Sequence, residues 1–437
     1  MEAGAGMKTD AQRGRCAARE GLRTRFMRTR MRTLALVLAL AAAAAGCGGR
    51  EDEAAVAPPA DEPSPTPAAA PAPEATPEPS PEPTPPPSVH PLTGLPAETP
   101  AADRPFAVIV ENSPSARPQS GLHLADIVYE VLAEGDITRF VAIFHSETAE
   151  EIGPVRSMRP YFVELGMAAD AVLVHAGWSQ EAMNLMAKHK WNHLDEVYGD
   201  HAYYWRDKSR KAPHNVYTST ELMRKGAEER KFRAEWNGFA LTFAPSGASA
   251  PAGAGAPAET DARNGADAGA GGSARNGADA PANGSARNGA DAPANGPARP
   301  GAEPAGSVPA LKATIPYIGK YEVEYEYDKE GGVYLRTMAG KPHEDKNTGV
   351  RIKAANVLVV ETKHRVVDSV GRREVDVKGP GQGYLLQGGI AVPIHWRLKD
   401  GAIRAYEDEA GTKEIPLLPG KTWVQIVPNA GKASFSG

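Results

Sequence analysis

The sequence predicts an α+β protein, with a mixed αβ N-terminal half and a largely antiparallel β C-terminal half. Residues 106–110 are uniformly apolar, as in a strand that is buried on both faces. Pro160 then opens a segment with the apolar spacing of a helix. Residues 321–327 alternate between Glu and apolar or aromatic residues, which is typical of a strand with one face in solvent.

The N-terminal half is expected to mix both kinds of element along the chain. After the strand at 106–110, residues 127–132 and 138–144 predict a hairpin around Glu134 and Gly135. A two-residue loop there would place Glu130 opposite Arg139. The elements expected next are a helix from Pro160, a strand at 171–175, a helix capped by Ser179 that runs to Met186, and a helix after Thr220.

The C-terminal half is expected to consist mainly of strands. Besides residues 321–327, apolar runs at 356–360, 391–396 and 422–427 are separated by glycine-rich turns. The pattern leaves open whether this half is a second domain or completes the sheet of the first.

Two segments lack the residues that a packed core needs. The chain of 437 residues has 45 glycines and 39 prolines, and residues 48–89 and 245–308 contain no aromatic residue, Leu, Ile or Met. Arg recurs every 12 residues in the second segment, at positions 263, 275, 287 and 299. The predicted organisation is a signal peptide (1–46), a disordered acidic Pro-rich tether (47–89), an αβ domain (90–244), a disordered low-complexity insert (245–308) and a β-rich domain (309–437).

The N-terminal leader resembles a bacterial lipoprotein signal. Several arginines precede residues 34–46, an uncharged run that is too short to span a bilayer and that ends at Cys47. Cys47 is therefore the predicted lipidation site and membrane anchor, and an ordinary secretory signal is the alternative. Met27 or Met31 are alternative start positions. Since Cys16 is the other cysteine, the mature chain would have no thiol nucleophile or disulfide.

Arg156 and Arg159 form the strongest local signal for a ligand site. They immediately precede the predicted helix at Pro160, where free N–H groups and the helix dipole favour an anion. No acidic run lies near them in the sequence, which favours an external anion. The alternative is that they pair with structural carboxylates such as Asp126 or Glu130.

His214 and Asn215 lie in an expected loop, where they could transfer a proton, contact a ligand or simply stabilise a turn. Ser179 follows a strand and precedes a helix, but Glu181 replaces the glycine of a nucleophile elbow, so an N-cap role is preferred. His189 and His193 have the spacing of a zinc pair without a clear third ligand. No complete nucleotide-binding or phosphate-loop motif is present, so no cofactor or metal is predicted.

Several ordered motifs resemble the YerB-like bacterial lipoproteins. They are residues 111–112, 116–122, 125–130, 137–140, 153–157, 174–177, 212–215, 340–343, 356–357 and 420–423. The similarity covers about residues 90–244 and 309–430, and the insert lies between its two parts. It implies an anchored extracytoplasmic protein with a two-part domain of unknown function, and it supplies no reaction or substrate.

These observations predict a lipoprotein on the outer face of the bacterial cytoplasmic membrane that binds an anionic envelope ligand, and the candidates are a cell-wall fragment, a polyphosphorylated lipid carrier and a peptide carboxylate. The formal net charge of −5 gives no broad basic field, so nucleic acid is not an expected partner. One alternative is an envelope hydrolase with His214 as general base and Arg156 or Arg159 stabilising negative charge, and another is a protein-recruiting scaffold. The predicted ligand-site residues are Asn112, Arg139, Arg156, Arg159, His175 and Asn215.

Overall fold

The computed structural model describes residues 88–99, 102–245, 306–319 and 321–437. Cys47 lies outside these ranges, as do most of the predicted tether and insert, so the predictions for them are not addressed by the structure. Among the described residues, no helix is long and apolar enough to cross a membrane.

The elements of the N-terminal half follow the predicted order. The strands that enter the main sheet are β1 (Phe106–Glu111), β2 (Ile127–Glu134), β3 (Ile137–Phe144), β4 (Val172–His175) and β5 (His193–Asp195). The α-helices are α1 (Pro160–Ala168), α2 (Gln180–His189) and α3 (Thr220–Glu229), and short pieces are η1 (Pro114–Ala116), η2 (Leu122–Leu124), η3 (His201–Tyr203), β6 (Trp205–Arg206) and β7 (Val216–Tyr217).

The C-terminal half is built mainly from strands, as predicted. It contributes β8 (Val308–Pro309), β14 (Asn356–Glu361), β17 (Gly381–Gln387), β18 (Ile390–Lys399), β19 (Ala402–Tyr406) and β20 (Thr422–Val427) to the main sheet. A second sheet contains β9 (Lys312–Pro316), β10 (Glu322–Asp328), β11 (Val333–Met338), β12 (Lys341–Pro342), β13 (Lys353–Ala354) and β21 (Ser434–Ser436). The remaining pieces are the pair β15 (His364–Val366) and β16 (Arg373–Val375), and η4 (Ala430–Lys432). The α+β class is therefore confirmed.

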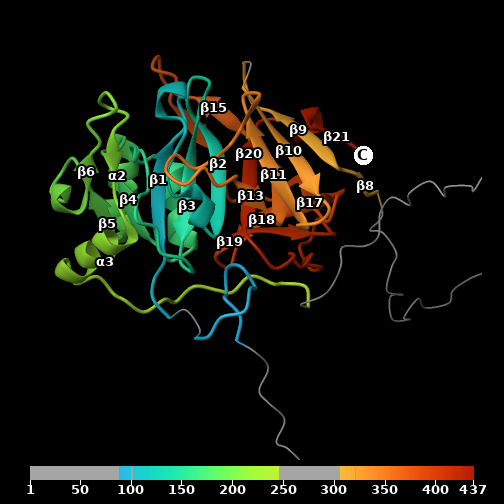
Figure 1. Ribbon diagram of the computed structural model, residues 1–437, viewed down its shortest axis with the longest axis horizontal. Helices are drawn as coiled ribbons and strands as arrows, with labels where there is room; N and C mark the ends of the chain where they lie inside the picture. The colour runs from blue at the N-terminus through green and yellow to red at the C-terminus, as the bar shows by residue number, and fades with distance from the viewer. Residues whose placement is uncertain (1–87, 100–101, 246–305, 320) are drawn as a thin grey trace, which may run out of the picture. The chain divides into compact units, whose positions relative to one another are not determined.

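The two halves share one 11-stranded sheet. Its order is β19-β18-β17-β14-β20-β2-β3-β1-β4-β5, with β8 added to β18. The halves meet where β20 pairs in parallel with β2, its neighbour in Figure 1. On its other side β20 pairs in parallel with β14. All six residues of β20 are buried, as expected for a central strand covered on both faces. The question that the sequence left open is answered by this pairing.

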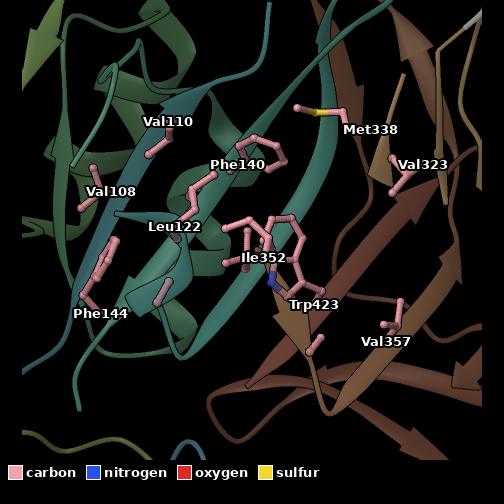
Figure 2. Packing of buried hydrophobic residues seen from close by; sticks show 14 of the residues in the cluster. Val108, Val110, Leu122, Phe140, Phe144, Val323, Met338, Ile352, Val357 and Trp423 are labelled. Carbon is pink, nitrogen blue, oxygen red and sulfur yellow. The ribbon is translucent and has the colours of Figure 1, made fainter. Parts of the chain in front are cut away.

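Each face of the main sheet has its own hydrophobic core. One core lies between the main sheet and the second sheet, where Trp423 of β20 packs near Phe140 of β3 and near Ile352 (Figure 2). The other core packs α1 and α2 against the opposite face through residues such as Phe162 and Met186. Side chains that alternate along one strand therefore enter two different environments.

The starts of the helices follow the predicted capping chemistry. Pro160 is the first residue of α1, where its missing N–H costs no hydrogen bond. The Ser179 hydroxyl accepts a hydrogen bond from the Ala182 N–H at 3.3 Å, so the N-cap interpretation of Ser179 is confirmed. The helix α2 runs to His189, three residues beyond the predicted end at Met186.

The register of the β2–β3 hairpin differs from the prediction. Residues 135–136 form the loop, and the pairing shifts between Leu132 and Glu134. As a result Arg139 lies opposite Val131, and Glu130 lies opposite Phe140. Because neighbouring residues of a strand point to opposite faces, this one-residue shift puts Glu130 and Arg139 on different faces of the sheet.

Candidate ligand pocket at the strand ends

The candidate site lies where parallel strands of the N-terminal half end. Strands β1, β4 and β5 run in parallel, so Glu111, His175 and Asp195 come at the same edge of the sheet. Ligands of open α/β sheets commonly bind outside the carboxyl ends of such strands, because the loops that follow them converge there. Some of the ligand-site residues predicted from the sequence lie together at this edge.

Glu111 is the buried acid of this edge. One oxygen of its carboxylate accepts a hydrogen bond from the Ser113 hydroxyl at 2.9 Å, and the other lies 2.9 Å from His214 Nδ1. Arg156 Nε lies 3.2 Å from the second oxygen, an ion pair without hydrogen-bond geometry. The Glu111 side chain is only 4% exposed, whereas those of Arg156 and His214 are 23% and 24% exposed. The buried Glu111 carboxylate thus contacts the partly exposed side chains of Arg156 and His214 on their protein-facing side.

Arg156 keeps free hydrogen-bond donors. Among the residues that the structure describes, its Nη1 and Nη2 atoms donate to no acceptor, and its ion pair with Glu111 is made at Nε. Arg156 lines a pocket of about 280 Å³ together with Ser157, Trp178, Tyr198 and Arg206, and we call this cavity the Arg156 pocket. A guanidinium whose two terminal nitrogens are unoccupied can bind a carboxylate or phosphate in a bidentate manner.

Arg139 and Arg159 serve a different cluster. Both pair with the carboxylate of Glu134, which Arg139 contacts at 2.6 Å. Arg139 Nη1 also donates to the Ser157 carbonyl at 2.9 Å, and Arg159 Nη1 donates to the Met158 carbonyl at 2.6 Å. Both arginines therefore pair with carboxylates, as the alternative interpretation of the sequence expected, because the fold brings Glu111 to Arg156 and Glu134 to Arg159. The partners are not Asp126 or Glu130, the carboxylates named from the sequence.

The pKa of Arg139 is lowered to about 10, mainly by burial and also by the neighbouring Arg159 and Arg156, while the charge of Glu134 raises it. The side chain of Arg159 is 9% exposed, so this cluster is more enclosed than the Arg156 pocket. Arg159 does line a separate pocket of about 870 Å³ with residues of the β15–β16 hairpin, but its guanidinium nitrogens already have protein partners.

His175 is fully buried and supports the site from behind. Its Nδ1 lies 3.0 Å from the Gly177 carbonyl and its Nε2 lies 3.2 Å from His193 Nδ1. Burial lowers the pKa of His175 to about 3, and the neighbouring His193 adds to this effect. His175 does not line the Arg156 pocket. His175 therefore lies behind the pocket wall, where its ring packs against Trp178.

The two predicted asparagines also occupy different places. The side-chain oxygen of Asn215 accepts a hydrogen bond from Arg206 Nη1 at 3.1 Å and so holds Arg206 beside the pocket. Asn112 points to the other face of the sheet, where its amide donates to Glu130 at 3.1 Å and to Thr138 at 2.7 Å. Asn112 is only 1% exposed and belongs to a buried network.

We call this network the Glu130 cluster, and it joins the two halves of the chain. Arg336 Nη2 from β11 donates to Glu130 at 2.5 Å, and both side chains are fully buried. Tyr321 donates to the other Glu130 oxygen at 2.6 Å. Arg336 also lies over the Trp423 ring, 4.6 Å from its centroid, and pairs with His343 Nδ1. Several motifs that carry the family resemblance therefore form a buried connection rather than an open site.

The two histidines with the spacing of a zinc pair do not form a metal site in the described structure. His189 ends α2 and His193 begins β5, so the helical spacing expected of a zinc pair is absent. Among the described residues, no three His, Cys, Asp or Glu side chains converge as metal ligands would.

Sequence reasoning missed Glu111, Trp178 and Tyr198 as site residues. Glu111 ends the uniformly apolar strand β1, and the other two lie in the loops that follow β4 and β5. The strand-end rule could have found all three, because it directs attention to residues just beyond parallel strands.

The fold and the motifs define a two-part α+β family. Residues 92–233 match the description "Protein of unknown function (DUF3048) N-terminal domain", and residues 313–424 match the corresponding "C-terminal domain". The chain belongs to this family, as its resemblance to YerB-like proteins predicted.

One relative is "Putative lipoprotein YerB" of Bacillus subtilis (strain 168), which is 35% identical over 347 residues, or 79% of this chain and 88% of that protein. A crystal structure of YerB protein from Bacillus subtilis is similar with a TM-score of 0.62 at 32% identity, covering 80% of this chain and all of that one.

Proposed function

We propose that this protein is a lipid-anchored protein on the outer face of the bacterial cytoplasmic membrane, and that it binds an anionic envelope ligand in the Arg156 pocket. The leader that ends at Cys47 and the name of the lipoprotein relative support the anchor. The folded halves, 90–244 and 309–437, are then presented outside the cell by the predicted tether.

The free terminal nitrogens of Arg156 carry the binding proposal. In the part of the chain that is described, they donate to no acceptor, while an ion pair with Glu111 at Nε restrains the same guanidinium. An arginine restrained by one carboxylate and open at two nitrogens can bind a second carboxylate or a phosphate with a smaller loss of conformational freedom. Arg159 lacks this property, since Glu134 and the Met158 carbonyl use its nitrogens.

Titration of the folded protein with acetate and with inorganic phosphate, followed by NMR chemical shifts, tests this function. At least one anion should shift resonances of the pocket loops in the wild-type protein, and Arg156→Ala should weaken that binding about tenfold or more. Arg159→Ala is the matched control and should leave it unchanged. Equal losses in both variants, or no binding to the wild-type protein, would contradict the proposal.

The anchor is tested separately with the full-length chain in a bacterial host. Replacing Cys47 by Ala should give a soluble secreted form or an unprocessed precursor, because residues 34–46 are too short to span a bilayer. A Cys47→Ala protein that keeps the processed size and the membrane partition of the wild-type protein would argue against lipidation.

A second candidate function is hydrolysis with His214 as general base. The pairing of His214 Nδ1 with the buried Glu111 carboxylate favours it, because such a carboxylate orients an imidazole and leaves its Nε2 for a bound water. The Ser113 hydroxyl lies 3.4 Å from His214 Nδ1, the nitrogen that also faces Glu111. A serine nucleophile activated by His214 would instead have to lie next to Nε2, so Ser113 does not fit that role. Turnover of a p-nitrophenyl ester that His214→Ala abolishes and Arg159→Ala retains would favour hydrolysis over simple binding.

A further inference from the structure

A stacked pair of aromatic side chains lines the Arg156 pocket. The rings of Trp178 and Tyr198 are nearly parallel, at 20°, with centroids 4.6 Å apart. Tyr198 is 65% exposed and the neighbouring Val197 is 52% exposed, and both line the pocket. Because one face of Tyr198 rests on Trp178, its opposite face remains available to a flat apolar partner.

One buried carboxylate, that of Asp195, forms hydrogen bonds with both loops that carry these rings, the loop after β4 and the loop after β5. Asp195 is 1% exposed, and its Oδ1 accepts hydrogen bonds from the Gly177 N–H at 2.7 Å and the Val197 N–H at 3.2 Å. Trp178 also packs edge-to-face against His175 and His193. The stack is therefore a supported surface, and a rigid surface loses little conformational entropy when a ligand binds.

The charges around the pocket fit an anion of low charge. Arg156 is paired with Glu111, and Arg206 is paired with Glu196 at 2.7 Å. The charges of these two arginines and two glutamates therefore cancel. A doubly charged phosphate in the pocket would be repelled by Glu196 as well as attracted by the arginines. A single carboxylate needs only the free nitrogens of Arg156. Glu196 and the neighbouring polar groups can in turn accept hydrogen bonds from hydroxyl groups.

We propose that the ligand of the Arg156 pocket is a sugar that carries a single carboxylate. The apolar C–H face of the pyranose ring lies on the open face of Tyr198, and the carboxylate occupies the fork of Arg156. The pocket volume of about 280 Å³ is close to the lower end of small-molecule sites and suits a single sugar ring. This assignment rests on the proposed function, because it names the ligand class of the same pocket.

Isothermal titration calorimetry of the folded wild-type protein with N-acetylmuramic acid, N-acetylglucosamine, acetate and adenosine monophosphate tests this proposal. The first compound has both a sugar ring and a carboxylate, the next two have one feature each, and the nucleotide offers a stacking base with a phosphate. N-acetylmuramic acid should bind about tenfold or more tightly than either N-acetylglucosamine or acetate.

Substitutions of Tyr198 and Arg156 test the contact with the sugar ring and the contact with the carboxylate separately. Tyr198→Ala should reduce the affinity for N-acetylmuramic acid to about that for acetate and leave acetate binding unchanged, whereas Tyr198→Phe should keep the wild-type affinity. Phe239 is 57% exposed and does not line the pocket, so Phe239→Ala is the matched aromatic control and should bind normally. Arg156→Ala should weaken both acids.

The outcomes also distinguish this proposal from the binding function on which it rests. Acetate binding that depends on Arg156, with no gain from the sugar ring or no effect of Tyr198→Ala, would overturn the sugar assignment alone. Tighter binding of adenosine monophosphate than of N-acetylmuramic acid would overturn it in favour of a nucleotide. Absence of any anion binding to the wild-type protein would overturn both.

Discussion

Two glutamates of the main sheet each pair with an arginine from outside that sheet, and the two pairs differ in their access to water. Glu130 and Arg336 have fully buried side chains, whereas Glu111 and Arg156 sit at the sheet edge with exposures of 4% and 23%. In the first pair, hydrogen bonds occupy both carboxylate oxygens and the rest of the network encloses them. In the second pair, the two terminal nitrogens of the arginine donate to no acceptor within the described ranges. The same residue types thus join two halves of a chain in one place and form a ligand pocket in the other.

The position of each glutamate along its strand explains the difference. Glu130 lies within β2 between Val128 and Leu132, which belong to the core that the second sheet covers. Glu111 is the last residue of β1 and points to the opposite face, next to loops. A charge in mid-strand must find its partner inside the protein, because water cannot reach it.

The largest effect is expected from breaking the buried pair. Arg336→Ala should lower the free energy of unfolding by about 3–5 kcal/mol, because it leaves the Glu130 carboxylate buried without its counter-charge. Urea denaturation followed by circular dichroism measures this. Arg365→Ala is the control: its pair with Glu374 is 72% and 64% exposed, and about 1 kcal/mol or less should be lost. Similar losses of stability in Arg336→Ala and Arg365→Ala would show that burial of the ion pair does not determine its contribution.

The second effect is a pH dependence that arises in the Glu130 cluster. Burial lowers the pKa of His343 well below its ordinary value, and the charge of Arg336 lowers it further. The ring is satisfied when neutral, since Nδ1 accepts from Arg336 and Nε2 lies 3.0 Å from the Gln119 side-chain oxygen. The unfolded chain therefore binds a proton near pH 6.5 that the folded chain does not, so stability should fall as the pH drops below that value.

This histidine alone should contribute a slope of up to about 1.4 kcal/mol per pH unit between about pH 6 and pH 5. Denaturation curves of wild-type protein, His343→Gln and a control, His189→Gln, at several pH values measure it. His343→Gln should reduce the slope even if its stability at pH 7 is lower, and the part that buried His175 contributes should remain. Exposed His189 at the end of α2 should not matter. An unchanged slope in His343→Gln would show that another group is responsible.

A smaller effect is expected from the partly enclosed Glu134 cluster. Arg159→Ala removes an ion pair whose side chains are 9% and 19% exposed, and Arg139 remains to neutralise Glu134. The free energy of unfolding should therefore fall by about 1–2 kcal/mol. Thermal and urea unfolding measure the loss, which should come without any change in anion binding. Weaker binding in this variant would place Arg159 in the ligand site after all.

The smallest effect on stability is expected at the pocket itself. Arg156→Ala should cost about 1 kcal/mol or less, because Ser113 and His214 continue to contact the Glu111 carboxylate and the lost side chain is partly exposed. The same variant should show the largest loss of ligand affinity, so stability and affinity should rank the arginines in opposite orders. A loss comparable to that of Arg336→Ala would make Arg156 a structural residue.

Local sequence signals found the three described α-helices, several of the strands and part of the site. Uniformly apolar residues predicted β1, strict alternation predicted β10, and Pro160 marked the start of α1. The sequence also selected Arg156 and His214, which the structure brings to one carboxylate. It grouped Arg159 with them because the two arginines are close in the chain. Their side chains nevertheless reach different glutamates.

The sequence by itself determined the α-helices, the strands with clear apolar patterns and the motifs that relate the chain to its family, because these depend on spacing between near neighbours. The tertiary structure alone decided which charges meet. A shift of one residue in the β2–β3 hairpin moved Glu130 to the face opposite Arg139, and its partner Arg336 lies 206 residues away in the chain. No local pattern encodes such a pairing, because it results from the way that β20 joins the two halves in one sheet.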